Sequence, residues 1–151
     1  MMNTLEIELI LQAVSPHFAG VYARNTLPSC PLSVPSFMVC NTDPDNKQGQ
    51  HWIAMYIDEK RRGEYYDPYG LSPFHLDFIN FLNRQCKTWI YNPVAVQHLN
   101  SLVCGQHCIY YLVHREMGMT MNDITEYLQS EWHANTYIVD DFVHHLERYL
   151  L

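Results

Sequence analysis

The sequence has no apolar run of about 18 residues, the length that a membrane-spanning helix requires. Its start, MMNTLEIELI, has no basic stretch followed by an apolar one, so it does not have the pattern of a signal peptide. We therefore expect a protein that is not secreted and does not contact a membrane.

Basic residues are also scarce. The chain of 151 residues has 9 Lys and Arg against 16 Asp and Glu, which gives a net charge of −7. Binding along nucleic acid depends on several basic side chains that neutralise phosphates, so this balance argues against a broad nucleic-acid surface. The one basic run, KRR at 60–62, is short and predicts a solvated turn.

Cysteines are few and odd in number, so they cannot all pair. The five are Cys30, Cys40, Cys86, Cys104 and Cys108. Without a secretory signal, free thiols in a reducing compartment are the default. The sequence has no repeat or low-complexity segment, and a chain of this length can bury roughly 70% of its unfolded surface. We expect one domain over 1–151 and a monomer.

The periodicity of the first half predicts a helix and several strands. Apolar residues at helical spacing predict a helix over 3–14, with Asn3 as N-cap and Glu6 completing a capping box. Two strand-like runs separated by EKRRG predict a β-hairpin. The expected strands and loops are a loop over 27–36, a strand over 37–41, a polar loop over 42–50, and hairpin strands over 51–58 and 63–67.

The second half predicts more helix. Ser72 and Pro73 fit the start of a helix over 72–85, with an apolar stripe of Phe74, Phe78, Phe81 and Leu82. Strands are expected over 87–91 and 94–98, and helices from Cys104 onward, the first ended by Gly118. This order predicts an α+β fold in which helices pack on a mainly antiparallel central sheet.

The stretch NSLVCGQHC at 100–108 places Cys104 in the first turn of a predicted helix. The positive end of the helix dipole favours a thiolate there, and the thiolate is the attacking species of cysteine nucleophiles. Gly105 has no side chain to block approach to the Cys104 N–H. The alternative on local sequence alone is an ordinary buried helical cysteine.

A thiolate needs a base, and His51 is the best placed of nine histidines. It opens an apolar strand after a flexible loop, which gives it a rigid scaffold and an exposed tip. His98, His107 and His114 are rivals. His107 lies about 60° short of a full helical turn from Cys104, which is a poor position for reaching the thiol.

Asp67 and Gln97 complete this constellation. Asp67 ends the hairpin strand that faces the start of the His51 strand, so the two side chains can be neighbours. Its carboxylate would then fix the imidazole tautomer, although an Asp in YYDPYG can also simply open a turn. Gln97, at the end of a predicted strand, could pair its amide with the Cys104 N–H as an oxyanion hole.

A zinc site is a further alternative, with Cys104, His107, Cys108 and His114 as ligands. Four ligands on one continuous helix cannot surround an ion tetrahedrally, and structural zinc sites draw ligands from separate segments. We therefore expect no metal.

Together these residues resemble the adenain family, the adenovirus maturation proteases. The similarity rests on His51–Trp52 at a strand, Asp67 in YDPYG, Gln97, and Cys104 in NSLVCG. HFAGVY at 17–22 after the first helix and a cysteine four residues beyond Cys104 add to it. The wider clan, which includes proteases of small ubiquitin-like modifiers, has the same order of His, acidic residue, Gln and Cys.

The resemblance implies roles for these positions. His51 is the general base, Asp67 orients it where human-type adenains carry Glu, Gln97 and the Cys104 N–H form the oxyanion hole, and Cys104 is the nucleophile. Trp52 corresponds to an aromatic wall beside the scissile bond. Cleavage is expected after Gly-Gly or Gly-Xaa, because only small residues fit the channel to the thiol.

Cys86 lies eleven residues before Gln97, where family members have a cysteine that forms a disulfide with an activating peptide. The resemblance therefore implies such a peptide, released from a capsid precursor. Adenains also use viral DNA as a cofactor, but the acidic charge of this chain argues against a DNA cofactor here.

The function expected from the resemblance is a viral cysteine endopeptidase that matures capsid and core precursor proteins, located in the virion and in the host nucleus or cytoplasm. The alternative is a processing protease or isopeptidase for ubiquitin-like modifiers, since the same catalytic order serves both. Adenains also carry a C-terminal extension beyond the last helix expected here.

Overall fold

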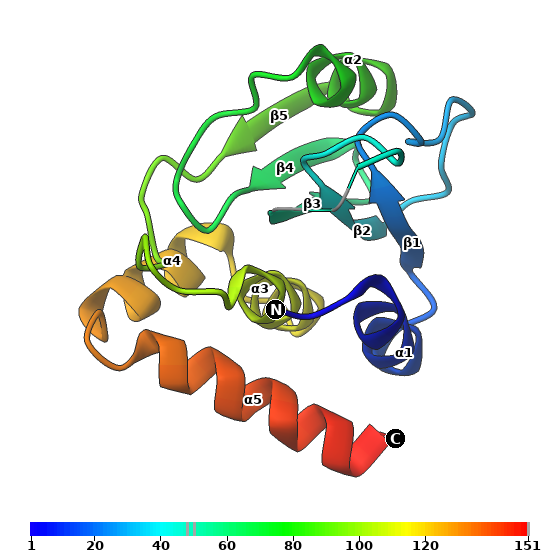
Figure 1. Cartoon of the computed structure of the whole chain (residues 1–151). Helices are drawn as coiled ribbons and strands as arrows, with labels where there is room; N and C mark the ends of the chain where they lie inside the picture. Colours follow the sequence, from blue (N-terminus) through cyan, green and yellow to red (C-terminus); the bar gives the residue numbers. More distant parts are fainter. Residues whose placement is uncertain (48, 50, 151) are drawn as a thin grey trace.

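The computed structural model describes residues 1–47, 49 and 51–150, and these contain five helices and five strands (Figure 1). The fold class is α+β, as predicted. In chain order the elements are α1 (Thr4–Val14), β1 (Phe18–Ala23), β2 (Ser36–Asn41), β3 (Trp52–Ile57), β4 (Arg62–Tyr66), α2 (Leu76–Gln85), β5 (Thr88–Tyr91), α3 (Cys104–Glu116), α4 (Met121–Ser130) and α5 (Asn135–Leu150).

The strands form a single sheet in the order β1-β2-β3-β4-β5. The central pairings, β2 with β3 and β3 with β4, are antiparallel as expected. The outer pairings, β1 with β2 and β4 with β5, are parallel, so the sheet is mixed rather than mainly antiparallel. A parallel neighbour needs a crossover connection, which α2 supplies between β4 and β5.

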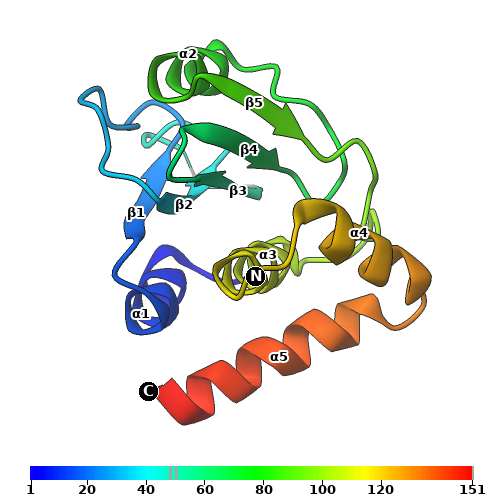
Figure 2. The ribbon, with the colours of Figure 1, turned by 180° about the vertical axis from the view of Figure 1, so that it is seen from behind.

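Both faces of the sheet are covered. On β3, alternate residues enter two separate cores: Trp52, Ala54 and Tyr56 pack with α1 and α3, while Ile53, Met55 and Ile57 pack with α2. The period of two of a strand produces this division. Figure 1 shows α2 on one side of the sheet and α1 and α3 on the other, with α5 outside α3; Figure 2 shows the same layers from behind.

Local signals in the sequence predicted several boundaries correctly. Asn3 and Glu6 form the capping box of α1, and Gly118, with φ of 97°, follows the end of α3. The hairpin of β3 and β4 forms as expected. Of the predicted polar loop 42–50, positions 48 and 50 lie outside the described residues, as does residue 151 of the expected single domain.

The predicted start of α2 was wrong. The helix begins at Leu76, with His75 rather than Ser72 at the N-cap position, and no side chain caps it. Phe74 is 72% exposed and so does not belong to the apolar stripe, whose other members are fully buried. Without burial of Phe74, a helical turn before Leu76 would gain no packing, and the segment stays extended.

The strand predicted over 94–98 was also wrong. Here the backbone N–H groups of Val96 and Gln97 both donate to the Pro68 carbonyl, at 2.8 and 3.0 Å, instead of joining a strand ladder. The reverse error concerns β1, which the sequence pattern did not indicate as a strand. Its residues are half-buried at the sheet edge, so they lack a clear apolar alternation.

No helix among the described residues combines the length and apolarity that crossing a membrane would require.

Candidate active site

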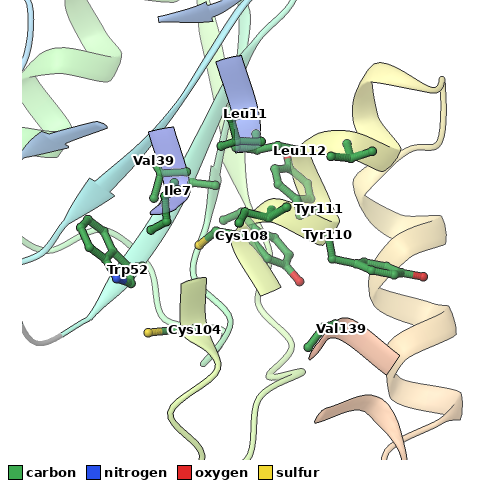
Figure 3. Close-up of a cluster of buried hydrophobic side chains, with 14 of the residues drawn as sticks. Ile7, Leu11, Val39, Trp52, Cys104, Cys108, Tyr110, Tyr111, Leu112 and Val139 are labelled. Atoms are coloured by element: carbon green, nitrogen blue, oxygen red, sulfur yellow. The ribbon is translucent and has the colours of Figure 1, made fainter. Parts of the chain in front are cut away.

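Cys104 is the first residue of α3, and its side chain is 2% exposed. The N-cap residue, Val103, offers no side-chain cap, and the first turn holds no acidic residue. The N–H groups at this end and the helix dipole are therefore free to act on a negative charge beside Cys104. In Figure 3, Cys104 lies at the start of α3, and Cys108 is one turn further along the helix.

His51 directly precedes β3 and contacts the carboxylate just after β4. The antiparallel register pairs Ala54 with Tyr66, which brings the start of β3 to the residues that follow β4. As a result, His51 Nε2 lies 2.7 Å from Asp67 Oδ1, and the two side chains are only 15% and 6% exposed. The hairpin argument from the sequence thus predicted a contact that the structure contains.

The surroundings of His51 favour its charged form. Burial alone would lower the pKa of this imidazole, but the hydrogen bond with Asp67, the neighbouring Cys104 thiol and the Asp67 charge raise it to about 9. Because Asp67 occupies Nε2, the other ring nitrogen is left for the thiol. An imidazolium held between a carboxylate and a sulfur can stabilise a thiolate and later donate a proton.

Two residues that sequence reasoning did not assign support this pair. The Tyr69 ring stacks on the His51 ring, with centroids 4.7 Å apart, and the Tyr69 N–H donates to Asp67 Oδ1 at 2.8 Å. The buried Asn92 side chain accepts from the Asp67 N–H at 3.0 Å and donates to the Asp67 carbonyl at 2.8 Å. The contact of Tyr69 could have been predicted from the Asp-Pro-Tyr turn in the sequence. The contact of Asn92 could not, because Asn92 is distant from Asp67 along the chain.

Gln97 lies on an irregular loop rather than at the end of a strand, and it is 2% exposed. Its Nε2 donates to the Ser101 carbonyl at 3.0 Å. Its Oε1 is buried without a hydrogen-bond partner among the described residues. The bond to Ser101 places the amide on the loop that leads directly into Cys104.

Trp52 is buried on the same side of the sheet as Cys104 and lies near the start of α3 (Figure 3). A Cβ at Gly105 would lie 3.4 Å from the Trp52 ring, so the absence of a side chain there allows the close approach. The indole Nε1 donates to the Met2 carbonyl at 3.0 Å.

The other candidate histidines, His98, His107 and His114, are not available as the base for Cys104. His98 Nε2 contacts the Trp132 carbonyl at 2.7 Å, and His114 Nδ1 contacts the Tyr110 carbonyl at 2.7 Å. His107 is fully buried, and burial together with His98 lowers its pKa to about 3. Within the described ranges, no group of three or more His, Cys, Asp or Glu side chains is arranged to hold a metal.

Cys86 lies apart from this constellation. It is the C-cap residue of α2 and packs against the core on the α2 side of the sheet, opposite to Cys104. Its thiol is half-buried beside Gly63, and burial raises its pKa to about 11 although Arg61 opposes this. All five cysteines are free in the described part of the chain.

The chain is similar in sequence to a protease of Bovine adenovirus B serotype 3, with 27% identity over 124 residues. The match covers 71% of this chain and 61% of that protease, so the chain spans about three fifths of its relative's length. No model of a protein family matches the chain. The sequence similarity to the adenovirus protease confirms the predicted resemblance to the adenain family.

Solved structures share the fold. The ASFV pS273R protease matches with a TM-score of 0.59 and 16% identity, over 83% of this chain and 61% of that one. The central domain of the uncharacterized Lpg1148 protein from Legionella pneumophila matches with a TM-score of 0.52 and 15% identity, over 100% and 99% of the two chains. At these identities, the structures support the fold alone.

Proposed function

We propose that this chain is a cysteine endopeptidase that matures viral structural precursor proteins. The observation that carries the proposal is the contact of His51 with Asp67, 2.7 Å long, beside a cysteine at the uncapped start of α3. The sequence similarity to an adenovirus protease supports the viral context.

The geometry supports an acyl-enzyme mechanism. The Cys104 thiolate attacks the scissile carbonyl carbon, and the oxygen that becomes negative accepts hydrogen bonds from the Cys104 N–H and the Gln97 amide. Imidazolium His51 donates its proton to the leaving amine, and the thioester remains on Cys104. Water then attacks the thioester with neutral His51 as base, and collapse of the intermediate releases the acid product and restores the thiolate–imidazolium pair.

The narrow surroundings of Cys104 favour small residues at the cleaved bond. Cys104 is 2% exposed, and Trp52 approaches the backbone of Gly105 closely. A substrate chain with Gly-Gly or Gly-Xaa before the cleaved bond has the least side-chain volume to place there. Precursors of the capsid and core are the expected substrates, and the virion and infected cell the expected location.

The decisive experiment compares Cys104→Ala with Cys30→Ala on a peptide that contains a Gly-Gly site. Cys30 is exposed and lies outside the site, so its loss should leave cleavage intact. Cys104→Ala should abolish detectable cleavage, because it removes the proposed nucleophile. Undiminished cleavage by Cys104→Ala would refute the assignment.

We also propose that a cysteine-containing peptide activates the protein through Cys86. The half-buried thiol, with a pKa of about 11, exchanges slowly until the peptide has docked beside it. Such a peptide should increase the cleavage rate of the wild-type chain. Equal stimulation of Cys86→Ser would exclude a required disulfide. With 9 basic residues and a net charge of −7, we expect no stimulation by DNA.

A further inference from the structure

The segment before α1 covers the candidate nucleophile. Met1 Sδ lies 4.0 Å from Cys104 Sγ, within van der Waals contact of two sulfur atoms. Met1 itself is 59% exposed, whereas Cys104 is 2% exposed. A substrate carbonyl therefore cannot reach the sulfur while Met1 stays in this position.

The backbone of the same segment is anchored. The Met2 carbonyl accepts a hydrogen bond of 3.0 Å from Trp52 Nε1, and Met2 is buried. The Met2 side chain packs over Gly105, where a Cβ would lie 3.2 Å from Met2 Cβ. Met2 thus places a backbone carbonyl at Trp52 and an apolar side chain over Gly105, the residue after Cys104, which are contacts that a bound peptide could make.

A cavity adjoins the Met1–Met2 segment. This cavity of about 510 Å³ is lined by Met1, Met2 and Trp52 on one side and by Tyr22, Asn41 and Asp43 at the ends of β1 and β2. Cys104 itself does not line this cavity, so Met1, which contacts both, separates the cavity from the thiol. A peptide that approached Cys104 through this cavity would have to displace Met1 and Met2 to reach the thiol.

We propose that the Met1–Met2 segment occupies the substrate cleft as a surrogate for a substrate backbone, and that Trp52 Nε1 transfers its hydrogen bond to a substrate carbonyl when the segment leaves. Trp52 is then a positioning residue as well as an apolar wall. This inference rests on the proposed function, because it takes the groove beside Cys104 to be the substrate cleft.

The test uses two variants with opposite expected effects on KM. A chain that lacks residues 1–2, released from a cleavable fusion, loses the cover. Trp52→Phe retains both methionines and the aromatic ring but lacks the N–H donor. The rate at which iodoacetamide alkylates Cys104 is followed by mass spectrometry, with exposed Cys30 as internal control and Leu5→Ala, an exposed residue of α1, as control variant.

Both variants should alkylate Cys104 about 5-fold faster or more, the factor that one net hydrogen bond represents. The alkylation rate of Cys30 should not change. On the Gly-Gly peptide, KM should fall for the shortened chain because substrate no longer competes with the segment. KM should rise for Trp52→Phe, because the substrate loses its donor.

An unchanged alkylation rate of Cys104 in the shortened chain would contradict the proposal that Met1 and Met2 cover this thiol. An unchanged or lower KM in Trp52→Phe would overturn the transfer of the hydrogen bond. If no chain, wild type included, cleaves any peptide, the proposed function fails, and with it the surrogate role. Faster alkylation of Cys104 in both variants would then still show that the segment covers this thiol.

Discussion

The two ends of helix α3 each meet a histidine and a carboxylate, yet they differ in what surrounds these groups. At the start, His51 and Asp67 are 2.7 Å apart and 15% and 6% exposed, and no side chain caps the helix. At the end, His17 and Glu116 are 3.1 Å apart and 43% and 17% exposed. The first pair is largely buried beside the proposed nucleophile, and the second is more exposed to solvent.

Side chains in the last two turns of α3 also hold the C-terminal end of this helix on the sheet. Arg115 makes two hydrogen bonds to the Glu64 carboxylate, at 2.9 and 3.2 Å, and the Tyr111 hydroxyl donates to the same group. The Arg115 guanidinium lies over the Tyr56 ring, 4.5 Å from its centroid. The donors and acceptors at this end are used in holding the helix on the sheet, whereas those at the start remain free for chemistry.

The largest expected effect separates the two histidines. His51→Ala should lower kcat/KM for the Gly-Gly peptide roughly 10³-fold, the usual contribution of a general acid–base. His17→Ala should leave kcat/KM unchanged, because its ring contacts Glu116 at the far end of the helix. Steady-state assays of both variants test this difference. Comparable losses in both would mean that the two pairs are not distinct in function.

The next effect concerns stability. Arg115→Met should lower the free energy of unfolding by about 3 kcal/mol, because it leaves the Glu64 carboxylate, which is only 15% exposed, without its cation. Arg62→Met is the matched control, since Arg62 pairs with Asp58 but is 66% exposed, and its loss should cost less than about 1 kcal/mol. Urea unfolding monitors both. Equal losses would contradict the contrast between buried and exposed pairs.

A pH series isolates the contribution of Asp67. The pKa of His51 is raised from 6.5 to about 9 in the folded chain, so its stabilisation is complete below pH 6.5 and is lost as pH rises through 9. Asp67→Asn should therefore reduce the free energy of unfolding by roughly 2 kcal/mol at pH 6. The difference between the two proteins should shrink towards pH 10. A difference that stays constant between these pH values would show that the ion pair does not contribute.

The smallest expected effect on stability concerns the C-terminal end of α3. The Ser15 hydroxyl donates to Glu116 at 2.8 Å. Ser15→Ala should lower the free energy of unfolding by about 1 kcal/mol, as for one hydrogen bond. Its kcat/KM should equal that of the wild type. A loss of activity without a loss of stability would show that this end influences catalysis.

Features set by neighbouring residues could be predicted from the sequence. The capping box of Asn3 and Glu6, the hairpin, and the proximity of His51 and Asp67 all follow from short-range spacing. The α+β class follows from the order of such elements.

Features that depend on distant contacts could not be predicted. The bonds of Asn92 to the Asp67 backbone join residues 25 positions apart, and the Met2 bond to Trp52 joins residues 50 apart. The loop that carries Gln97 resembled a strand in its apolar pattern, but its N–H groups bond to Pro68 instead of to a neighbouring strand. No local pattern distinguishes these two outcomes.

The bonds to the Pro68 carbonyl tie the turn of Asp67 to the loop of Gln97, and Gly70 lies where the two backbones touch. Gly70 has φ of 74°, and a Cβ there would lie 2.6 Å from the Ala95 nitrogen. A side chain at this position would push the Asp67 turn and the Gln97 loop apart, and with them the proposed orienting carboxylate and the proposed oxyanion amide. We therefore expect Gly70 to tolerate little substitution, although it is not among the proposed catalytic residues.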